Sequence, residues 1–190
     1  MSAAATVSGG RLVIVRHADT DWTASGRHTG RTELALNAAG RAKARALRKR
    51  LAPWAGATVW SSPLARATQT AALAGFVPVL RDELMEWNYG EYEGLTSEQI
   101  RARRPGWNMW RDGCPGGEDA ADVARRAEAV LASLPAAGDV VIFSHGHMLR
   151  VLTARWLGLA AVDGALFPLA PGGVGVLDHD QGRRVLRSWL

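Results

Sequence analysis

Two apolar stretches, each leading into a histidine, constrain the fold of this chain most strongly. Residues 12–15 read Leu-Val-Ile-Val and run directly into Arg16 and His17, while residues 140–143 read Val-Val-Ile-Phe and reach His145 after one serine. Unbroken runs of this kind are typical of strands buried on both faces, as in parallel sheets. In open α/β sheets, ligands bind at the carboxyl ends of the strands. Both histidines are therefore expected at the sheet edge where a binding site forms.

Strand-like and helix-like segments alternate along the rest of the chain. Asn37 is the predicted N-cap of an alanine-rich helix that ends at Pro53, and Ser62 is the predicted N-cap of the next helix, with Pro63 at its first position. Further strands are predicted at 57–60 and 77–80, a turn and a strand at 168–177, and a last strand or tail at 184–190. Further helices are predicted at 96–104, 118–134 and 147–157. This alternation predicts a three-layer α/β fold with a mostly parallel central sheet and helices on both faces.

Length and composition favour one domain. The chain has 190 residues, 47% of them hydrophobic, which suits a single core. We expect one domain at 11–190 after a disordered lead-in at 1–10, which lacks the charged start and apolar core of a signal peptide. No apolar run approaches the ~20 residues of a membrane span. Cys114 is the only cysteine, so no internal disulfide forms. A cytoplasmic protein without a membrane partner is expected.

The positive charge of the chain comes almost entirely from arginine. The net charge is +5, and the densest basic stretch is 41–50. We interpret that stretch as a solvated helix face and expect no nucleic-acid partner. A weaker cluster, Arg101, Arg103 and Arg104, could line a site for an anionic substrate.

Two further polar residues are predicted near the histidines. Arg66 lies in the first turn of a helix that directly follows a strand, where backbone N–H groups and the helix dipole favour an anion. Glu86 lies in a loop rich in acids, aromatics and glycines. Two arginines, two imidazoles and a carboxyl group suit phosphoryl transfer without a metal. The arginines bind the phosphoryl oxygens, a histidine attacks phosphorus, and the acid protonates the leaving oxygen.

The residue types leave alternatives open. Glu91 and Glu93 compete with Glu86 for the role of the acid. A metal hydrolase using His17, His145 and Asp19 is also conceivable, although no closely spaced set of ligands accompanies them. We therefore predict no metal.

Other histidines and tryptophans carry weaker signals. His28, His147 and His179 are interpreted as surface or supporting residues. Four tryptophans fit either a core or an aromatic wall of the site: Trp22, Trp87, Trp107 and Trp110.

Four motifs spread over residues 11–177 carry a resemblance to a known family. They are Arg16-His17-Ala18-Asp19-Thr20, the segment 61–71 (Ser-Ser-Pro-Leu-Ala-Arg-Ala-Thr-Gln-Thr-Ala), Glu86, and Ser144-His145-Gly146. Together they resemble the histidine phosphatase superfamily, in the branch that contains cofactor-dependent phosphoglycerate mutases and related phosphatases. Actinobacterial broad-specificity acid phosphatases are most similar, and sugar bisphosphatases of the sedoheptulose type share a related pattern.

The resemblance implies a phosphoglycerate mutase-like fold and a phosphohistidine formed on His17. Arg16, Arg66 and His145 would bind the phosphoryl group, and Glu86 would donate the proton. The resemblance also implies a small phosphorylated substrate, no cofactor and a homodimer. It assigns five residues to substrate binding, namely Thr23, Thr29, Gly30, Tyr89 and Gly146.

The chain departs from the family pattern in two respects. Ala18 replaces the usual glycine after the histidine, a change small enough for activity to survive. The chain also lacks the longer basic insertion with which the mutases hold a bisphosphoglycerate, which favours hydrolysis. A cofactor-dependent phosphoglycerate mutase or a sugar bisphosphatase is the alternative enzyme. A phosphate-ester binding module without turnover is the alternative outside enzymes.

Overall fold

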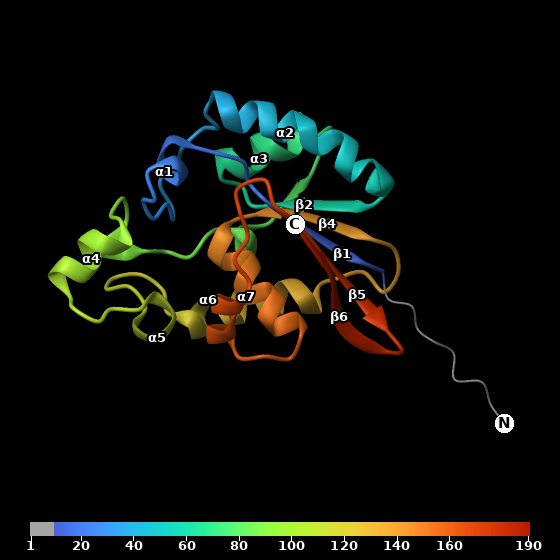
Figure 1. Ribbon diagram of the computed structural model, residues 1–190. Coiled ribbons are helices and arrows are strands. Elements are labelled where there is room, and N and C mark those ends of the chain that lie inside the picture. The colour runs from blue at the N-terminus through green and yellow to red at the C-terminus, as the bar shows by residue number, and fades with distance from the viewer. Residues whose placement is uncertain (1–9) are drawn as a thin grey trace.

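The fold is built on a six-stranded sheet with the order β3-β2-β4-β1-β5-β6 (Figure 1). The computed structural model describes residues 10–190, so the expected lead-in lies outside the described residues except for Gly10. Neighbours among β1, β2, β3 and β4 pair in parallel, whereas β5 and β6 form an antiparallel hairpin beside β1. The strands are β1 (Leu12–Arg16), β2 (Thr58–Ser61), β3 (Val79–Leu80), β4 (Val140–Ser144), β5 (Val174–Asp180) and β6 (Arg183–Trp189).

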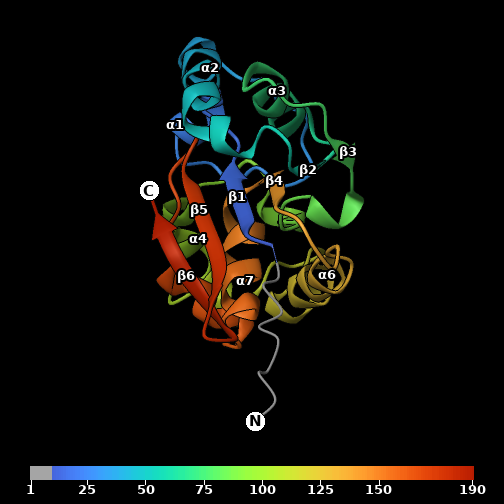
Figure 2. The ribbon, with the colours of Figure 1, turned by 90° about the vertical axis from the view of Figure 1, so that its right-hand side faces the viewer.

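Helices cover both faces of the sheet, which confirms the predicted three layers (Figure 2). On one side lie α2 (Ala38–Leu51) and α3 (Ala65–Leu73), and on the other α6 (Ala120–Ala132) and α7 (Gly146–Trp156). Side chains alternate along β1, so Val13 and Val15 pack with α2 while Leu12 and Ile14 pack with the other helices. Because both faces are buried, the strands need the continuous apolar sequence noted above.

The shorter helices gather beyond the carboxyl ends of β1 and β4. In Figure 1, α1, α4 and α5 lie on that side of the sheet. No helix within residues 10–190 is long and apolar enough to cross a membrane. The short elements are α1 (Asp21–Ala24), α4 (Ser97–Arg103), α5 (Met109–Asp112) and the 3₁₀ helices Ala52–Trp54, Asp82–Leu84, Gly90–Tyr92 and Ala161–Leu166.

The start of α3 corrects one prediction. Ser62 is not an N-cap, because α3 begins at Ala65 and its N-cap, Leu64, makes no side-chain capping bond. Ser62 instead continues the path of β2, where its backbone N–H donates to the carbonyl of Phe143. Its hydroxyl lies 2.7 Å from Nε2 of His145. The predicted third strand, at 77–80, is also shorter and covers only Val79–Leu80.

Candidate active site

His17 follows the last residue of β1 and is 3% exposed. Its Nδ1 lies 2.8 Å from the carbonyl oxygen of Ala18. A carbonyl can only accept, so Nδ1 carries the proton and Nε2 keeps a free lone pair. Burial, reinforced by the positive charges of Arg66 and Arg16, holds the pKa of His17 well below its ordinary value. His17 is therefore a neutral, oriented imidazole, the form required of a nucleophile.

A cavity of about 170 Å³ opens beside His17. Six of the ten predicted site residues line it, while Arg66, His145, Gly30 and Gly146 do not. Four lining residues were not predicted as site residues, namely Gly26, Arg27, His28 and His147. The turn-rich composition of 19–31 marks this segment as a functional loop, but nothing in it singles out His28. The lining is formed by Arg16, His17, Thr23, Gly26, Arg27, His28, Thr29, Glu86, Tyr89 and His147.

Glu86 is buried and lies against the N-terminus of α7. Its Oε1 accepts from the backbone N–H of Trp87 and of Met148, both at 2.9 Å. Among residues 10–190, its Oε2 accepts from a single donor, the N–H of His147, at 3.1 Å. Oε2 is thus the oxygen with more room for a proton.

The two competing acids lie outside this cavity. Glu91 is exposed, and neither Glu91 nor Glu93 lines the space beside His17. Oε1 of Glu93 accepts from the N–H groups of Gly30 and Thr32, at 2.8 and 3.2 Å. Glu93 therefore fixes the loop that borders the site, and Glu86 is the acid that lines the cavity.

The guanidinium of Arg16 has an unused donor. Its Nη1 donates to the carbonyl of Leu169 at 2.5 Å, whereas its buried Nε has no partner among residues 10–190. Burial lowers the pKa of Arg16, and the negative charge of Glu86 opposes this effect. Gly146 lets the guanidinium approach α7, since a Cβ there would lie 3.1 Å from Cζ of Arg16. A buried N–H without an acceptor is suited to bind an oxygen of an anion.

Arg66 and His145 form a fully buried pair behind His17. Nε of Arg66 donates to Nδ1 of His145 at 3.2 Å, so Nε2 of His145 carries the proton and donates to the hydroxyl of Ser62. Burial, reinforced by Arg66, holds the pKa of His145 well below its ordinary value. The rings of His17 and His145 are 5.1 Å apart, between centroids.

The remaining donors of Arg66 hold the loop that contains two predicted substrate-binding residues. Its Nη2 donates to the carbonyls of Thr29 and Gly30, at 3.1 and 2.8 Å, and its Nη1 to that of Thr32 at 3.0 Å. Arg66 and His145 thus bind protein groups rather than lining the cavity. Their role as phosphoryl ligands stays a prediction.

His147 supports a tyrosine on the wall of the cavity. The hydroxyl of Tyr89 lies 2.6 Å from Nδ1 of His147. Burial raises the pKa of Tyr89 well above its ordinary value and holds that of His147 well below its own. The phenol therefore donates to the neutral ring, and the proton of His147 lies on Nε2.

Within residues 10–190, no group of three or more histidine, cysteine or acidic side chains lies in a position to hold a metal ion. Asp19, part of the alternative metal set, forms an ion pair with Lys43 at 2.6 Å.

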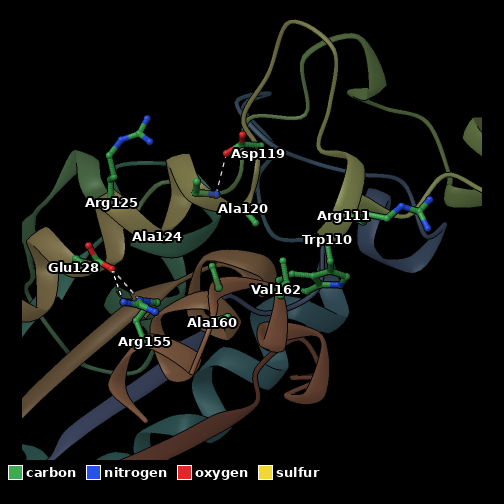
Figure 3. Close-up of a pocket in the computed structure, with 12 residues that line it drawn as sticks. Trp110, Arg111, Asp119, Ala120, Ala124, Arg125, Glu128, Arg155, Ala160 and Val162 are labelled. Carbon is green, nitrogen blue, oxygen red and sulfur yellow. Dashed lines mark hydrogen bonds and ion pairs between the residues drawn. The ribbon is translucent and has the colours of Figure 1, made fainter. Parts of the chain in front are cut away.

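A larger hollow of about 520 Å³ lies elsewhere, between α5, α6 and the segment 160–162 (Figure 3). It contains none of the predicted site residues. Its charged groups include Glu128 and Arg155, which pair with each other at 2.8 Å. The smaller cavity therefore contains predicted site residues that the larger hollow lacks.

Comparison with known proteins shows the family to which the chain belongs. A model of the histidine phosphatase superfamily (branch 1) matches residues 12–190. The chain belongs to this superfamily. Among histidine phosphatase relatives, an acid phosphatase of Mycobacterium tuberculosis is 38% identical over 93% of this chain and 90% of its own length. The sedoheptulose 1,7-bisphosphatase of Saccharomyces cerevisiae is 36% identical over 78% of this chain and 68% of its own length.

Solved structures place the fold in the same superfamily. The structure of the open reading frame Rv3214 from Mycobacterium tuberculosis superposes with a TM-score of 0.90 at 37% identity, covering 95% of this chain and 96% of that one. A mycobacterial glucosyl-3-phosphoglycerate phosphatase in complex with VO3 gives a TM-score of 0.86 at 31% identity, covering 95% and 98%. This histidine phosphatase thus has the phosphoglycerate mutase-like α/β fold that the sequence predicts.

Proposed function

We propose that this histidine phosphatase hydrolyses small phosphomonoesters through a phosphohistidine on His17, without a metal or cofactor. The observation that carries the proposal is the state of His17, which is neutral, with its proton on Nδ1 and its ring against a cavity shared with Arg16 and Glu86. A phosphatase is the class that several relatives are named for.

In the first step, Nε2 of His17 attacks phosphorus and forms an N–P bond while the bond from phosphorus to the ester oxygen breaks. Glu86 gives a proton to that leaving oxygen, which departs as an alcohol. In the second step, water attacks phosphorus, its proton goes to Glu86, and the N–P bond breaks to release inorganic phosphate. Glu86 thus ends the cycle protonated, as it began.

Arginines stabilise the charge that spreads over the phosphoryl oxygens. Arg16 does so with its free Nε–H. Arg66 and His145 complete the site, as the resemblance implies, when Arg66 exchanges its bonds to the carbonyls of Thr29 and Gly30 for phosphoryl oxygens. Thr23, Thr29, Gly30, Tyr89 and Gly146 line or shape the space for the substrate.

The proposal includes a homodimer in the cytoplasm. Val77, Val79 and Leu80 are exposed apolar residues at the edge strand β3, which supports an interface there. Cys114 is a free, buried thiol, which is compatible with a reducing compartment.

The test is hydrolysis of p-nitrophenyl phosphate in the presence of EDTA by the wild type, His17→Ala and His179→Ala. We expect kcat to survive EDTA and to fall by at least about 10³-fold in His17→Ala, since the nucleophile is lost. His179→Ala removes a histidine outside the cavity and keeps full activity. Brief reaction with ³²P-labelled substrate labels the wild type with an acid-labile, alkali-stable phosphate. Activity of His17→Ala near the wild-type value would contradict the proposal.

Measurements with 3-phosphoglycerate separate the alternatives. A phosphoglycerate mutase would isomerise 3-phosphoglycerate and require 2,3-bisphosphoglycerate, whereas the proposed enzyme releases inorganic phosphate. Binding of a phosphate ester without turnover would identify a binding module.

A further inference from the structure

A second cavity, of about 190 Å³, adjoins the candidate active site. The two cavities share His28 and His147 in their linings. The loop at His28 is held to the chain before α4 by two backbone bonds: its N–H donates to the carbonyl of Leu95, and its carbonyl accepts from Gly94. The second cavity is lined by His28, Ser97, Arg101, Trp107, Asn108, Met109, Trp110 and His147.

The lining of this second cavity combines polar side chains with two tryptophans. Nε2 of His28 lies 3.1 Å from the hydroxyl of Ser97. Trp107 is buried and lies edge-on to His28, with ring centroids 6.0 Å apart, and Trp110 lies 5.3 Å from His147. Hydroxyl and imidazole groups beside aromatic rings are suited to a ligand that carries both C–H faces and hydroxyl groups.

The charges in the second cavity favour an anion. Arg101 is its only arginine, and its lining contains no acidic residue. Burial lowers the pKa of both His28 and His147, so both rings are neutral at pH 7 and add no charge. Within residues 10–190, the guanidinium of Arg101 has no hydrogen bond or ion pair to another side chain. An uncommitted guanidinium binds carboxylate or phosphate.

The shared wall supplies a further donor. Because Nδ1 of His147 accepts from Tyr89, its Nε2–H is free to donate to a ligand. Arg150 stacks on Trp110, with Cζ 4.7 Å from the ring centroid, and this contact fixes the aromatic side of the cavity.

We propose that the second cavity binds the leaving group of the substrate and that Arg101 selects phosphomonoesters with a second anionic group at the far end of a hydroxylated leaving group. The proposal rests on the phosphatase function proposed above. The phosphoryl group lies beside His17, the hydroxylated chain passes His28 and His147, and the distal anion pairs with Arg101.

Two substrates that differ in one group test this inference. Sorbitol 6-phosphate and 6-phosphogluconate share the same phosphate ester and hydroxylated chain, but only the second ends in a carboxylate. We expect the wild type to prefer 6-phosphogluconate in kcat/KM by about two- to fivefold, the range for an exposed charge pair such as one with Arg101. In Arg101→Gln this preference falls to about one, and in Arg101→Glu it is reversed.

Arg103→Gln is the matched control, since Arg103 is an exposed arginine on the same helix that does not line the cavity. It keeps the wild-type preference. Equal kcat/KM for both substrates in the wild type, or the same loss of preference in Arg103→Gln, would overturn the inference. If p-nitrophenyl phosphate is hydrolysed but neither sugar derivative is, the proposed leaving-group site is wrong, whereas the proposed phosphatase activity is supported. Failure with all three substrates would overturn the proposed function itself.

Discussion

The cavity beside His17 and the larger hollow of Figure 3 differ in whether their polar groups have partners, as well as in volume. The hollow measures about 520 Å³ and the cavity about 170 Å³. In the hollow, Glu128 and Arg155 neutralise each other at the surface, with half-exposed side chains. In the cavity, Arg16 has a buried donor without a partner and His17 has a free lone pair. Buried polar groups without partners, rather than a larger volume, are the reason for proposing the ligand site beside His17.

The largest expected difference between the two regions concerns their glutamates. Glu86→Gln keeps the size of the side chain but removes the proton that the leaving oxygen needs, so we expect kcat for an alkyl phosphate to fall by about 10³-fold. The fall is smaller for p-nitrophenyl phosphate, whose leaving group requires less protonation. Glu128→Gln, in the hollow, is the control and keeps the kcat of the wild type. Equal effects on the two substrates would argue against Glu86 as the proton donor.

Two adjacent arginines of α6 differ in burial: Arg126 is mostly buried and Arg125 is mostly exposed. Arg126 binds Glu118 through Nε and Nη2 at 2.8 Å, and its Nη1 donates to the carbonyls of Glu83 and Met85, which flank the Glu86 loop. Arg125 lines the hollow, pairs with Asp122 and is mostly exposed. Arg126→Met therefore leaves a mostly buried carboxylate unpaired, and we expect the free energy of unfolding to fall by about 3 kcal/mol.

Urea unfolding measures this effect, with Arg125→Met as the control, for which we expect a loss of less than about 0.5 kcal/mol. In the folded fraction of Arg126→Met, kcat should also fall while KM changes little, because the loop that carries Glu86 loses its anchor. Similar losses of stability in Arg126→Met and Arg125→Met would contradict the expectation that the mostly buried ion pair of Arg126 stabilises the fold more than the exposed pair of Arg125.

The smallest expected effect is a dependence of stability on pH. His17, His145 and His147 have folded pKa values well below the ordinary value, so below about pH 6.5 the unfolded chain binds protons that the folded protein does not. Stability is therefore fully present above this pH and is lost as the pH falls. From pH 7 to pH 6 we expect a loss of about 2 kcal/mol from the three groups.

Urea unfolding at the two pH values measures this loss, and His147→Gln should reduce it by about a third. The hollow contains no histidine, so substitutions there leave the pH dependence unchanged. A free energy of unfolding that does not change between pH 7 and pH 6 would contradict the buried, neutral state of these rings.

The local sequence predicted which helices and strands form more accurately than it predicted where they begin and end. The helix after Asn37 begins where predicted, because the asparagine side chain accepts from the N–H of Gly40. The helix after Ser62 begins only at Ala65, because the backbone of Ser62 still pairs with β4: its N–H donates to the carbonyl of Phe143. The serine hydroxyl accepts from the N–H of Leu64, before the helix, and from Nε2 of His145. The start of this helix therefore depends on strand pairing with a segment distant in the sequence.

The sequence alone determined the layered fold, the superfamily and the placement of Arg16, His17 and His145 at one edge of the sheet. The fold and this placement follow from short-range patterns, since buried parallel strands need continuous apolar runs and their carboxyl ends meet at one edge. The superfamily was indicated by the resemblance of the four motifs. The tertiary structure decided which acid lines the cavity, that Arg66 and His145 lie behind His17, and that His28 and His147 join two cavities. Those outcomes depend on burial and on hydrogen bonds between residues far apart in the chain, which no local pattern encodes.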